Sequence, residues 1–206
     1  MKKIKELSIL LCLVLMVTAF AGCGKEKNDI ITKDTSTTEP TKEEIVLPDD
    51  FPMEMLFLSG AGGWSTNITI KKDGSFAGVY SDSEMGSRGP DYPYGTVYIC
   101  EFSGKFDIIE KIDETSYSLK LVDIEVEDEG TTEWIEDGIK YIVSEPFGLE
   151  SGEDFILYTP DKKTEDLSEE FLMWWPLRYE EEEYSTLSVY GLHNLETDYG
   201  FFGQIY

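Results

Sequence analysis

Residues 62–80 have the pattern of a β-hairpin: Gly62-Gly63-Trp64-Ser65-Thr66-Asn67-Ile68-Thr69-Ile70-Lys71-Lys72-Asp73-Gly74-Ser75-Phe76-Ala77-Gly78-Val79-Tyr80. Alternate residues from Trp64 to Ile70 fall on one face, because the side chains of a strand alternate between its two faces. The Asp73-Gly74 pair supplies the positive φ angle of a tight turn, and Phe76, Gly78 and Tyr80 alternate on the return. We therefore expect a hairpin whose apolar face belongs to a core.

Strand patterns continue on both sides of this hairpin. A mostly apolar run covers residues 53–58, and residues 96–102 begin an alternation that continues through Ser103-Gly104 to Ile108. On the next strand, residues 117–126, the alternation changes face after Leu121, and a β-bulge near Val122-Asp123 would restore it. Asp137-Gly138 joins residues 132–136 to 139–143 as a second hairpin. Further strands are expected at residues 154–159, 186–190 and 201–206.

Helical character is confined to one short segment. Ser168 is a suitable N-cap, acidic residues follow it, and Pro176 ends the helix. About ten short strands with one short helix predict a mainly β fold, either an antiparallel β-barrel or a sandwich, and we favour the barrel. Gly62-Gly63-Trp64 is similar to the Gly-X-Trp of lipocalin-like barrels, in which a tryptophan closes one end. The aromatic side chains after Ser168 are expected to cap the barrel rather than to form a sugar platform: Phe171, Trp174 and Trp175.

The N-terminus has the features of an export signal. It is basic from Met1 to Lys5 and apolar from Leu7 to Phe20, shorter than the roughly 20 apolar residues of a membrane span. Phe20-Ala21-Gly22-Cys23 resembles the lipobox of bacterial lipoproteins, although Phe20 stands where leucine is more usual. The resemblance implies that Cys23 carries a diacylglycerol and becomes the N-terminus. The alternative is a soluble secreted protein in which Cys23 has no such role.

Three segments follow from this pattern. Residues 1–22 are expected to be a signal peptide, residues 23–48 a lipidated flexible tether, and residues 49–206 a single mostly β domain. The tether is rich in charged and hydroxyl residues, and some 25 flexible residues have a root-mean-square reach of roughly 25–30 Å. The expected location is therefore the extracytoplasmic face of the cell membrane, with the membrane as a partner through the lipid.

Charge and cysteine content restrict the partners. Removal of residues 1–22 takes away three lysines and one glutamate, which leaves 14 basic and 41 acidic residues and a formal net charge of about −27. Such a charge repels nucleic acid and favours cationic partners. With Cys12 removed and Cys23 lipidated, Cys100 is left without an intramolecular disulfide partner. Its apolar surroundings in the sequence predict a small buried residue.

A broader resemblance covers residues 60–106 and the end of the chain. Gly62-Gly63-Trp64-Ser65-Thr66, Asp73-Gly74-Ser75-Phe76, Gly95-Thr96-Val97-Tyr98 and the closing Gly191-Leu192-His193-Asn194 are similar to a group of uncharacterised lipoproteins from Gram-positive gut anaerobes. The resemblance implies a cell-envelope location and a shared fold. It carries no site residues.

The connection formed by residues 81–95 is the best candidate for a ligand site, because long structured loops are often functional. Its acidic and tyrosine side chains are the candidate binding residues: Asp82, Glu84, Asp91, Tyr92 and Tyr94. The carboxylates offer oxygen ligands for calcium, but their spacing does not match an EF-hand, so we expect no cofactor and no metal site. The tyrosines suit a sugar or a peptide, or pack back on the barrel.

No catalytic constellation is recognisable. His193 is followed by Asn194 and lacks a serine or cysteine in a nucleophile motif. The abundance of carboxylates leaves a glycosidase-like acid and base pair open as an alternative. The favoured hypothesis is a cell-envelope lipoprotein that binds a small ligand, a glycan or an envelope protein without catalysis. The second hypothesis is a secreted hydrolase that uses a carboxylate pair.

Overall fold

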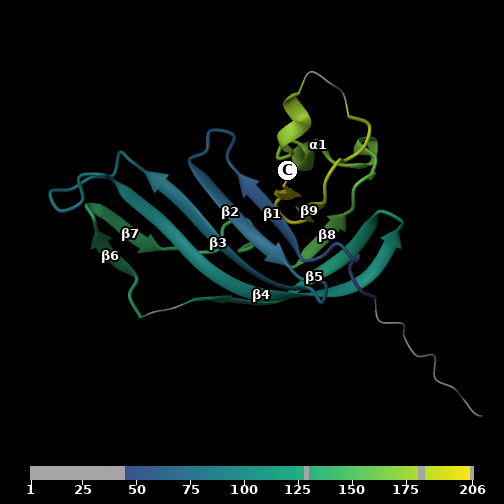
Figure 1. The fold of residues 1–206 in the computed structure, drawn as a ribbon, viewed down its shortest axis with the longest axis horizontal. Helices are drawn as coiled ribbons and strands as arrows, with labels where there is room; N and C mark the ends of the chain where they lie inside the picture. The colour runs from purple at the N-terminus through teal and green to yellow at the C-terminus, as the bar shows by residue number, and fades with distance from the viewer. Residues whose placement is uncertain (1–44, 128–129, 181–183, 205–206) are drawn as a thin grey trace, which may run out of the picture. The chain divides into compact units, whose positions relative to one another are not determined.

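The computed structural model describes residues 45–127, 130–180 and 184–204. Within these residues eight strands close into an antiparallel β-barrel, in the order β1-β2-β3-β4-β5-β8-β9-β10, with β10 paired to β1 (Figure 1). Strands β6 and β7 extend the sheet beside β4. The prediction of a mainly β barrel with about ten strands and one short helix is confirmed. The signal peptide and residues 23–44 of the tether lie outside the described residues.

The predicted first hairpin is β2 (Trp64–Ile70) and β3 (Ser75–Glu84), and β1 (Met53–Leu58) pairs with β2. Thr66, Ile68 and Ile70 are buried, as the alternation predicts. Gly74 has a φ angle of 84°, which a residue with a Cβ atom rarely adopts. The hairpin therefore forms at the Asp73-Gly74 turn and directs its apolar face into the barrel.

The long strand β4 (Thr96–Asp113) pairs with β5 (Ser116–Val126) through a predicted bulge. Lys105 is opposite Asp123, whereas the next residue, Phe106, is opposite Leu121, so Val122 is the extra residue. This bulge brings Ile124 back to the core face, which the alternation would otherwise make it leave. The bulge near Val122-Asp123 is confirmed.

Aromatic side chains fill the barrel interior. Phe57 is at the centre of one group, and its ring centroid lies 4.8–5.6 Å from those of Trp64, Phe147, Trp174, Tyr199 and Phe201. A second group joins Phe76, Phe102, Phe106 and Phe155. These rings pack against one another and occupy much of the space between the strands.

The extension consists of β6 (Glu133–Glu136) and β7 (Ile139–Val143), the predicted second hairpin. Asp137 and Gly138 both have positive φ angles, 49° and 76°, as a two-residue turn of this kind needs. Strand β7 runs parallel to the start of β4, with Thr96 opposite Lys140. Figure 1 shows β6 and β7 beside this end of β4, away from α1.

The remaining barrel strands are β8 (Asp154–Tyr158), β9 (Gly191–Asn194) and β10 (Gly200–Gly203). The segment between β8 and β9, which we call the excursion (residues 159–190), contains η1 (Thr164–Asp166), α1 (Glu169–Leu172) and η2 (Pro176–Tyr179). The predicted N-cap is present, because Ser168 Oγ accepts a hydrogen bond from the Phe171 N–H at 3.2 Å. The short helix is thus where the sequence places it.

The excursion packs against the outer surface of the barrel through a second apolar cluster. Phe171, Leu172 and Trp175 are buried with Tyr158 of β8 and Phe202 of β10, whose side chains point outward because their neighbours point inward. The expectation that these aromatic residues cap the barrel holds for Trp174, which contacts Phe57 and Trp64. Phe171 and Trp175 instead cover the barrel wall.

One expected strand and the expected end of the tether differ from the structure. Residues 186–190 form no strand. Residues 184–187 instead pair with residues 161–164 through an isolated bridge, in which Lys163 is opposite Thr186. Leu187 packs into the second cluster. At the other end, Leu47 is 1% exposed and Ile45 packs against the core, so residues 45–48, expected in the tether, contact the barrel.

Candidate functional sites

The carboxylates of the predicted site lie at the extension but do not converge. Asp82 and Glu84 belong to β3, opposite Tyr98 and Thr96, rather than to a loop. The Tyr98 O–H donates to Glu84 Oε2 at 3.3 Å. Asp91 lies in the exposed connection. Among the described residues no group of three or more histidine, cysteine or acidic side chains has the arrangement of a metal site.

The two tyrosines of the predicted site contact the second hairpin. The Tyr94 N–H donates to the Gly138 carbonyl at 3.0 Å, and the Tyr94 side chain is 62% exposed. Lys140 Nζ lies 5.9 Å from the centre of the Tyr92 ring, within cation–π range. The connection between β3 and β4 is therefore held against the turn between β6 and β7, and both contribute to one end of the molecule.

Tyr80 lies near the carboxylates at the end of β3. Burial, with the negative charges of Asp82 and Glu150, raises its pKa to about 12. The phenol therefore keeps its proton in mildly alkaline solution as well as at neutral pH and remains a hydrogen-bond donor.

A groove of about 420 Å³ lies on the outer face of the extension. Ile99 and Val143 line it with Trp134, which is 37% exposed and stacks on Tyr141 at 5.0 Å between ring centroids with 11° between the planes. Ile99 faces outward because Cys100, its neighbour on β4, faces the core. The apolar part of this groove is thus built from three strands.

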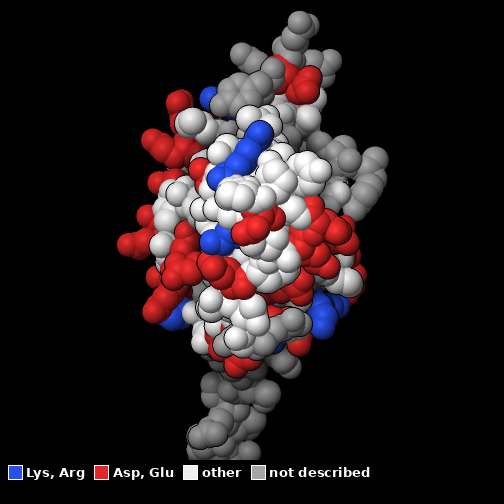
Figure 2. All heavy atoms as spheres, turned by 90° about the vertical axis from the view of Figure 1, so that its left-hand side faces the viewer, with Lys and Arg blue, Asp and Glu red and all other residues white. Residues whose placement is uncertain are grey.

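Carboxylates border the same groove. Glu101 of β4 and Glu127 of the β5–β6 connection line it together with Thr131, and the Glu127 N–H donates to the Glu101 carbonyl at 2.8 Å. In the described part of the chain neither carboxylate forms an ion pair with a lysine or arginine. Figure 2, which views the side on which β6 and β7 lie, shows acidic side chains over much of this face and few basic ones.

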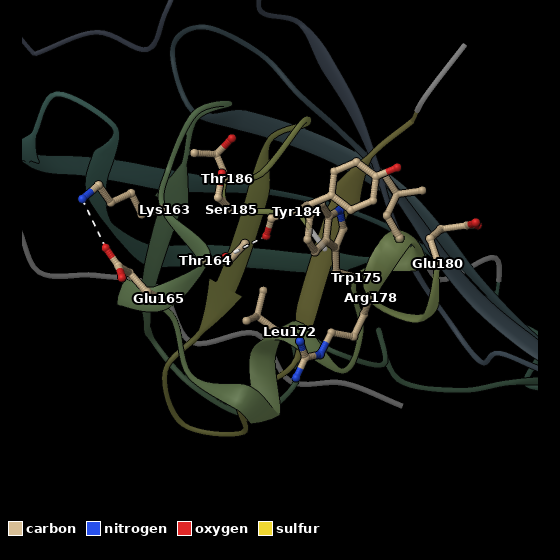
Figure 3. A pocket seen from close by; sticks show the side chains of 11 residues that line it. Lys163, Thr164, Glu165, Leu172, Trp175, Arg178, Glu180, Tyr184, Ser185 and Thr186 are labelled. Carbon is tan, nitrogen blue, oxygen red and sulfur yellow. Dashed lines mark hydrogen bonds and ion pairs between the residues drawn. The ribbon is translucent and has the colours of Figure 1, made fainter. Parts of the chain in front are cut away.

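A second hollow, of about 680 Å³, lies within the excursion (Figure 3). Its lining comes from η1, from the end of α1, from η2 and from residues 184–186. Basic, acidic, hydroxyl and apolar side chains contribute together: Lys163, Thr164, Glu165, Leu172, Trp175, Leu177, Arg178, Glu180, Tyr184, Ser185 and Thr186. We call this hollow the excursion pocket.

The groups suited to nucleophilic chemistry are buried in the apolar clusters. Cys100 is 1% exposed, as predicted, and burial with the nearby charge of Glu145 raises the pKa of its thiol to about 11. His193 lies beneath the excursion with its Nε2 atom 2.9 Å from Asp198 Oδ1 and far in sequence from Cys100. Neither side chain has the exposure that a catalytic nucleophile or base needs.

Sequence patterns missed both hollows. The groove requires the parallel pairing of β7 with β4, and the excursion pocket requires the pairing of Lys163 with Thr186. Neither pairing has a local sequence signal. No helix among the described residues has the length and apolar character to cross a bilayer.

Comparisons with known proteins add no family to this geometry. No protein-family model, curated protein or solved structure matches the chain at a significant level.

Proposed function

We propose that this chain is an extracytoplasmic lipoprotein, anchored through Cys23, that binds a basic extended segment of another envelope protein without catalysis. The groove on the outer face of the extension supports this function, because it combines an apolar slot with two carboxylates. The filled barrel interior favours a partner that binds at the surface.

The lining of the groove suits a lysine or arginine side chain. Such a side chain buries its aliphatic stem along apolar surface and keeps its cation in a polar environment. Ile99, Val143 and Trp134 provide the apolar surface, and the face of Trp134 also attracts a cation. Glu101 and Glu127 supply the opposite charge. The strong excess of acidic residues in the chain raises the local concentration of a cationic partner and its association rate.

Strand β6 favours an extended conformation of the bound segment. It is the last strand of the sheet and pairs with β7 on one side, so within the described residues its other edge has no strand partner. All four residues of β6 are exposed, with Trp134 directed to the groove. A peptide that aligns with such an edge gains main-chain hydrogen bonds, and pockets along the edge select its side chains.

The anchor and the location rest on the sequence. Phe20-Ala21-Gly22-Cys23 and the polar residues after it support a lipidated N-terminus on a flexible tether. Mass spectrometry of the membrane fraction tests this part. A mature N-terminus at Cys23 with the mass of a diacylglycerol is expected, and an unmodified protein that starts elsewhere would refute the anchor.

Binding to basic peptides tests the groove. A library of extended peptides with one or two arginines among small apolar residues should yield binders. Trp134→Ala and Glu101→Gln should each weaken their affinity about tenfold. Glu110→Gln, an exposed carboxylate farther along β4, is the matched control and should leave the affinity unchanged. Equal losses for Glu101→Gln and Glu110→Gln would mean that net charge alone attracts the peptide, and the groove would have no role.

A hydrolase remains the second candidate because Glu165 and Glu180 both line the excursion pocket. In Figure 3 the Glu165 carboxylate forms an ion pair with Lys163. The Glu180 carboxylate points away from the other side chains drawn. This arrangement favours binding over acid and base catalysis. Hydrolysis of a glycan or ester panel by the wild-type protein, with loss of activity in Glu165→Gln or Glu180→Gln, would overturn the non-catalytic proposal.

A further inference from the structure

We infer that the excursion pocket is a binding site for a sugar residue that carries a carboxylate. This site is separate from the groove on the extension, since the two share no lining residue. Its volume of about 680 Å³ lies within the range of small-molecule sites, about 300–1,000 Å³.

Backbone pairing fixes one wall of the pocket. The Thr164 N–H donates to the Ser185 carbonyl at 3.0 Å, and Thr164 Oγ1 donates to the Tyr184 carbonyl at 2.9 Å. Lys163 and Thr186 form a bridge between the same two segments. The hydroxyl groups of Ser185 and Thr186 are therefore presented from a short paired ribbon rather than from a free loop.

Packing on the barrel fixes the opposite wall. Leu172 and Trp175 are buried in the second cluster against Tyr158 and Phe202, and the Arg178 N–H donates to the Trp175 carbonyl at 3.0 Å. The segment η2, which carries Arg178, is thus attached to the packed surface of the barrel. A site with both walls fixed before binding loses little conformational entropy when the ligand enters.

Arg178 provides the selectivity for an acidic group. Its side chain is exposed and lines the pocket, and within the described residues it forms no ion pair. Lys163 instead forms an ion pair with Glu165, with 3.2 Å between Nζ and Oε1. In Figure 3 the guanidinium group of Arg178 lies near Leu172, at the side opposite Thr186. A guanidinium binds a carboxylate through two parallel hydrogen bonds, a geometry that a lysine cannot provide.

The rest of the lining matches the body of a sugar. A sugar ring has an apolar face of C–H groups and a rim of hydroxyls. Leu172 and Leu177 offer apolar contact, and the half-buried Tyr184 ring, 5.6 Å from that of Trp175, adds an aromatic surface. Ser185, Thr186 and Glu165 supply donors and acceptors for the hydroxyl rim. A simple carboxylic acid would leave these polar groups without partners.

Titration of the purified protein by amide NMR tests this assignment, with glucuronate, glucose and acetate as probes. Glucuronate should shift the signals of Thr164, Arg178 and Ser185 with a dissociation constant in the millimolar range or below, and glucose should bind about tenfold more weakly. Arg178→Gln should remove that difference. Arg88→Gln, which changes the chain's other arginine, is the matched control and should keep it. Ser185→Ala should weaken both sugars.

Three results would overturn the inference. The first is the absence of shifts at these residues up to the solubility limit of glucuronate. The second is equal affinity for glucose and glucuronate in the wild-type protein, which would remove the role of Arg178. The third is acetate binding as tightly as glucuronate, which would mean that the pocket recognises a carboxylate only. Trp134→Ala serves as a test of independence, because it removes the groove on the extension and should leave glucuronate binding intact.

Discussion

The Nε2 atom of His193 lies 2.9 Å from Asp198 Oδ1, and the imidazole stacks on the ring of Phe171 with 4.5 Å between centroids. Ser168, the N-cap of α1, also donates to Asp198 Oδ1, at 3.3 Å. His193 of β9 and Ser168 of the excursion therefore both contact Asp198, which lies in the β9–β10 turn. The Nδ1 atom of His193 is buried without a hydrogen-bond partner among the described residues.

This connection makes stability depend on pH. Burial lowers the pKa of His193 below its ordinary value of 6.5, although Asp198 acts in the opposite direction. As pH falls below about 6.5 the unfolded chain binds a proton that the folded protein does not, so the free energy of unfolding decreases toward the folded pKa. Urea unfolding at several pH values between about 8 and 5 measures how the free energy of unfolding depends on pH. In His193→Gln the dependence across this window should be reduced, and an unchanged dependence would contradict the prediction.

Gly104 allows β3, β4 and β5 to approach closely. A Cβ atom at this position would overlap the Asp123 carbonyl oxygen and the Phe76 ring. Gly104→Ala should therefore lower the free energy of unfolding by about 1–3 kcal/mol, as overpacking of a core does. Gly86→Ala is the control, because a Cβ atom there meets nothing within 4 Å. Similar unfolding midpoints for the two variants would show that β4 does not need a glycine at this bulge.

The barrel could be predicted from the sequence because its signals are local. Asp73-Gly74 and Asp137-Gly138 fix two turns, and the change of face after Leu121 reveals the bulge at Val122. The candidate sites depend instead on pairings between distant segments. Strand β7 joins β4 in parallel across some 40 residues, and Thr164 meets Ser185 through backbone groups that any residue type carries. Of the residues predicted to lie in the loop, Asp82 and Glu84 belong to β3, and the groove was not predicted.

Cys100 should be unreactive in the folded protein. Burial and the charge of Glu145 raise the pKa of its thiol to about 11, and the thiolate is the reactive species. Iodoacetamide at about pH 8 should leave the Cys100 peptide unmodified in the native protein and alkylate it fully in denaturant, as read by mass spectrometry. Rapid alkylation of the native protein would mean that β4 opens locally at this point.

Phe57 should be among the most sensitive core positions. Its ring contacts those of Trp64 and Trp174 at 4.8 Å, so its loss leaves a cavity that rigid aromatic neighbours cannot close. Phe57→Ala should cost about 3–5 kcal/mol in guanidinium unfolding. Met173→Ala, which truncates a side chain 59% exposed, is the control and should cost less than about 0.5 kcal/mol. A small loss for Phe57→Ala would indicate an interior less filled than the structure describes.

Asn194 links β9 to residues 148–151 through its side-chain amide. It is fully buried, donates from Nδ2 to the carbonyls of Gly148 and Ser151 at 3.1 and 2.5 Å, and accepts from the Glu196 N–H at 3.0 Å. Asn194→Asp keeps the shape but replaces the two donors with a carboxylate oxygen that faces both carbonyls. Loss of about 3 kcal/mol or more at neutral pH is expected, since a buried charge is left without donors.

The same exchange at Asn67 provides the control for Asn194→Asp. Asn67 is exposed on β2, so Asn67→Asp adds the same charge to the same barrel and should change the free energy of unfolding by no more than about 0.5 kcal/mol. Guanidinium unfolding of both variants at neutral pH separates the two effects. Because protonation of the new carboxyl restores one donor, the Asn194→Asp variant should regain stability as the pH is lowered toward about 4, which Asn67→Asp should not do. Equal losses in the two variants would mean that added charge, rather than the lost amide donors, accounts for the effect.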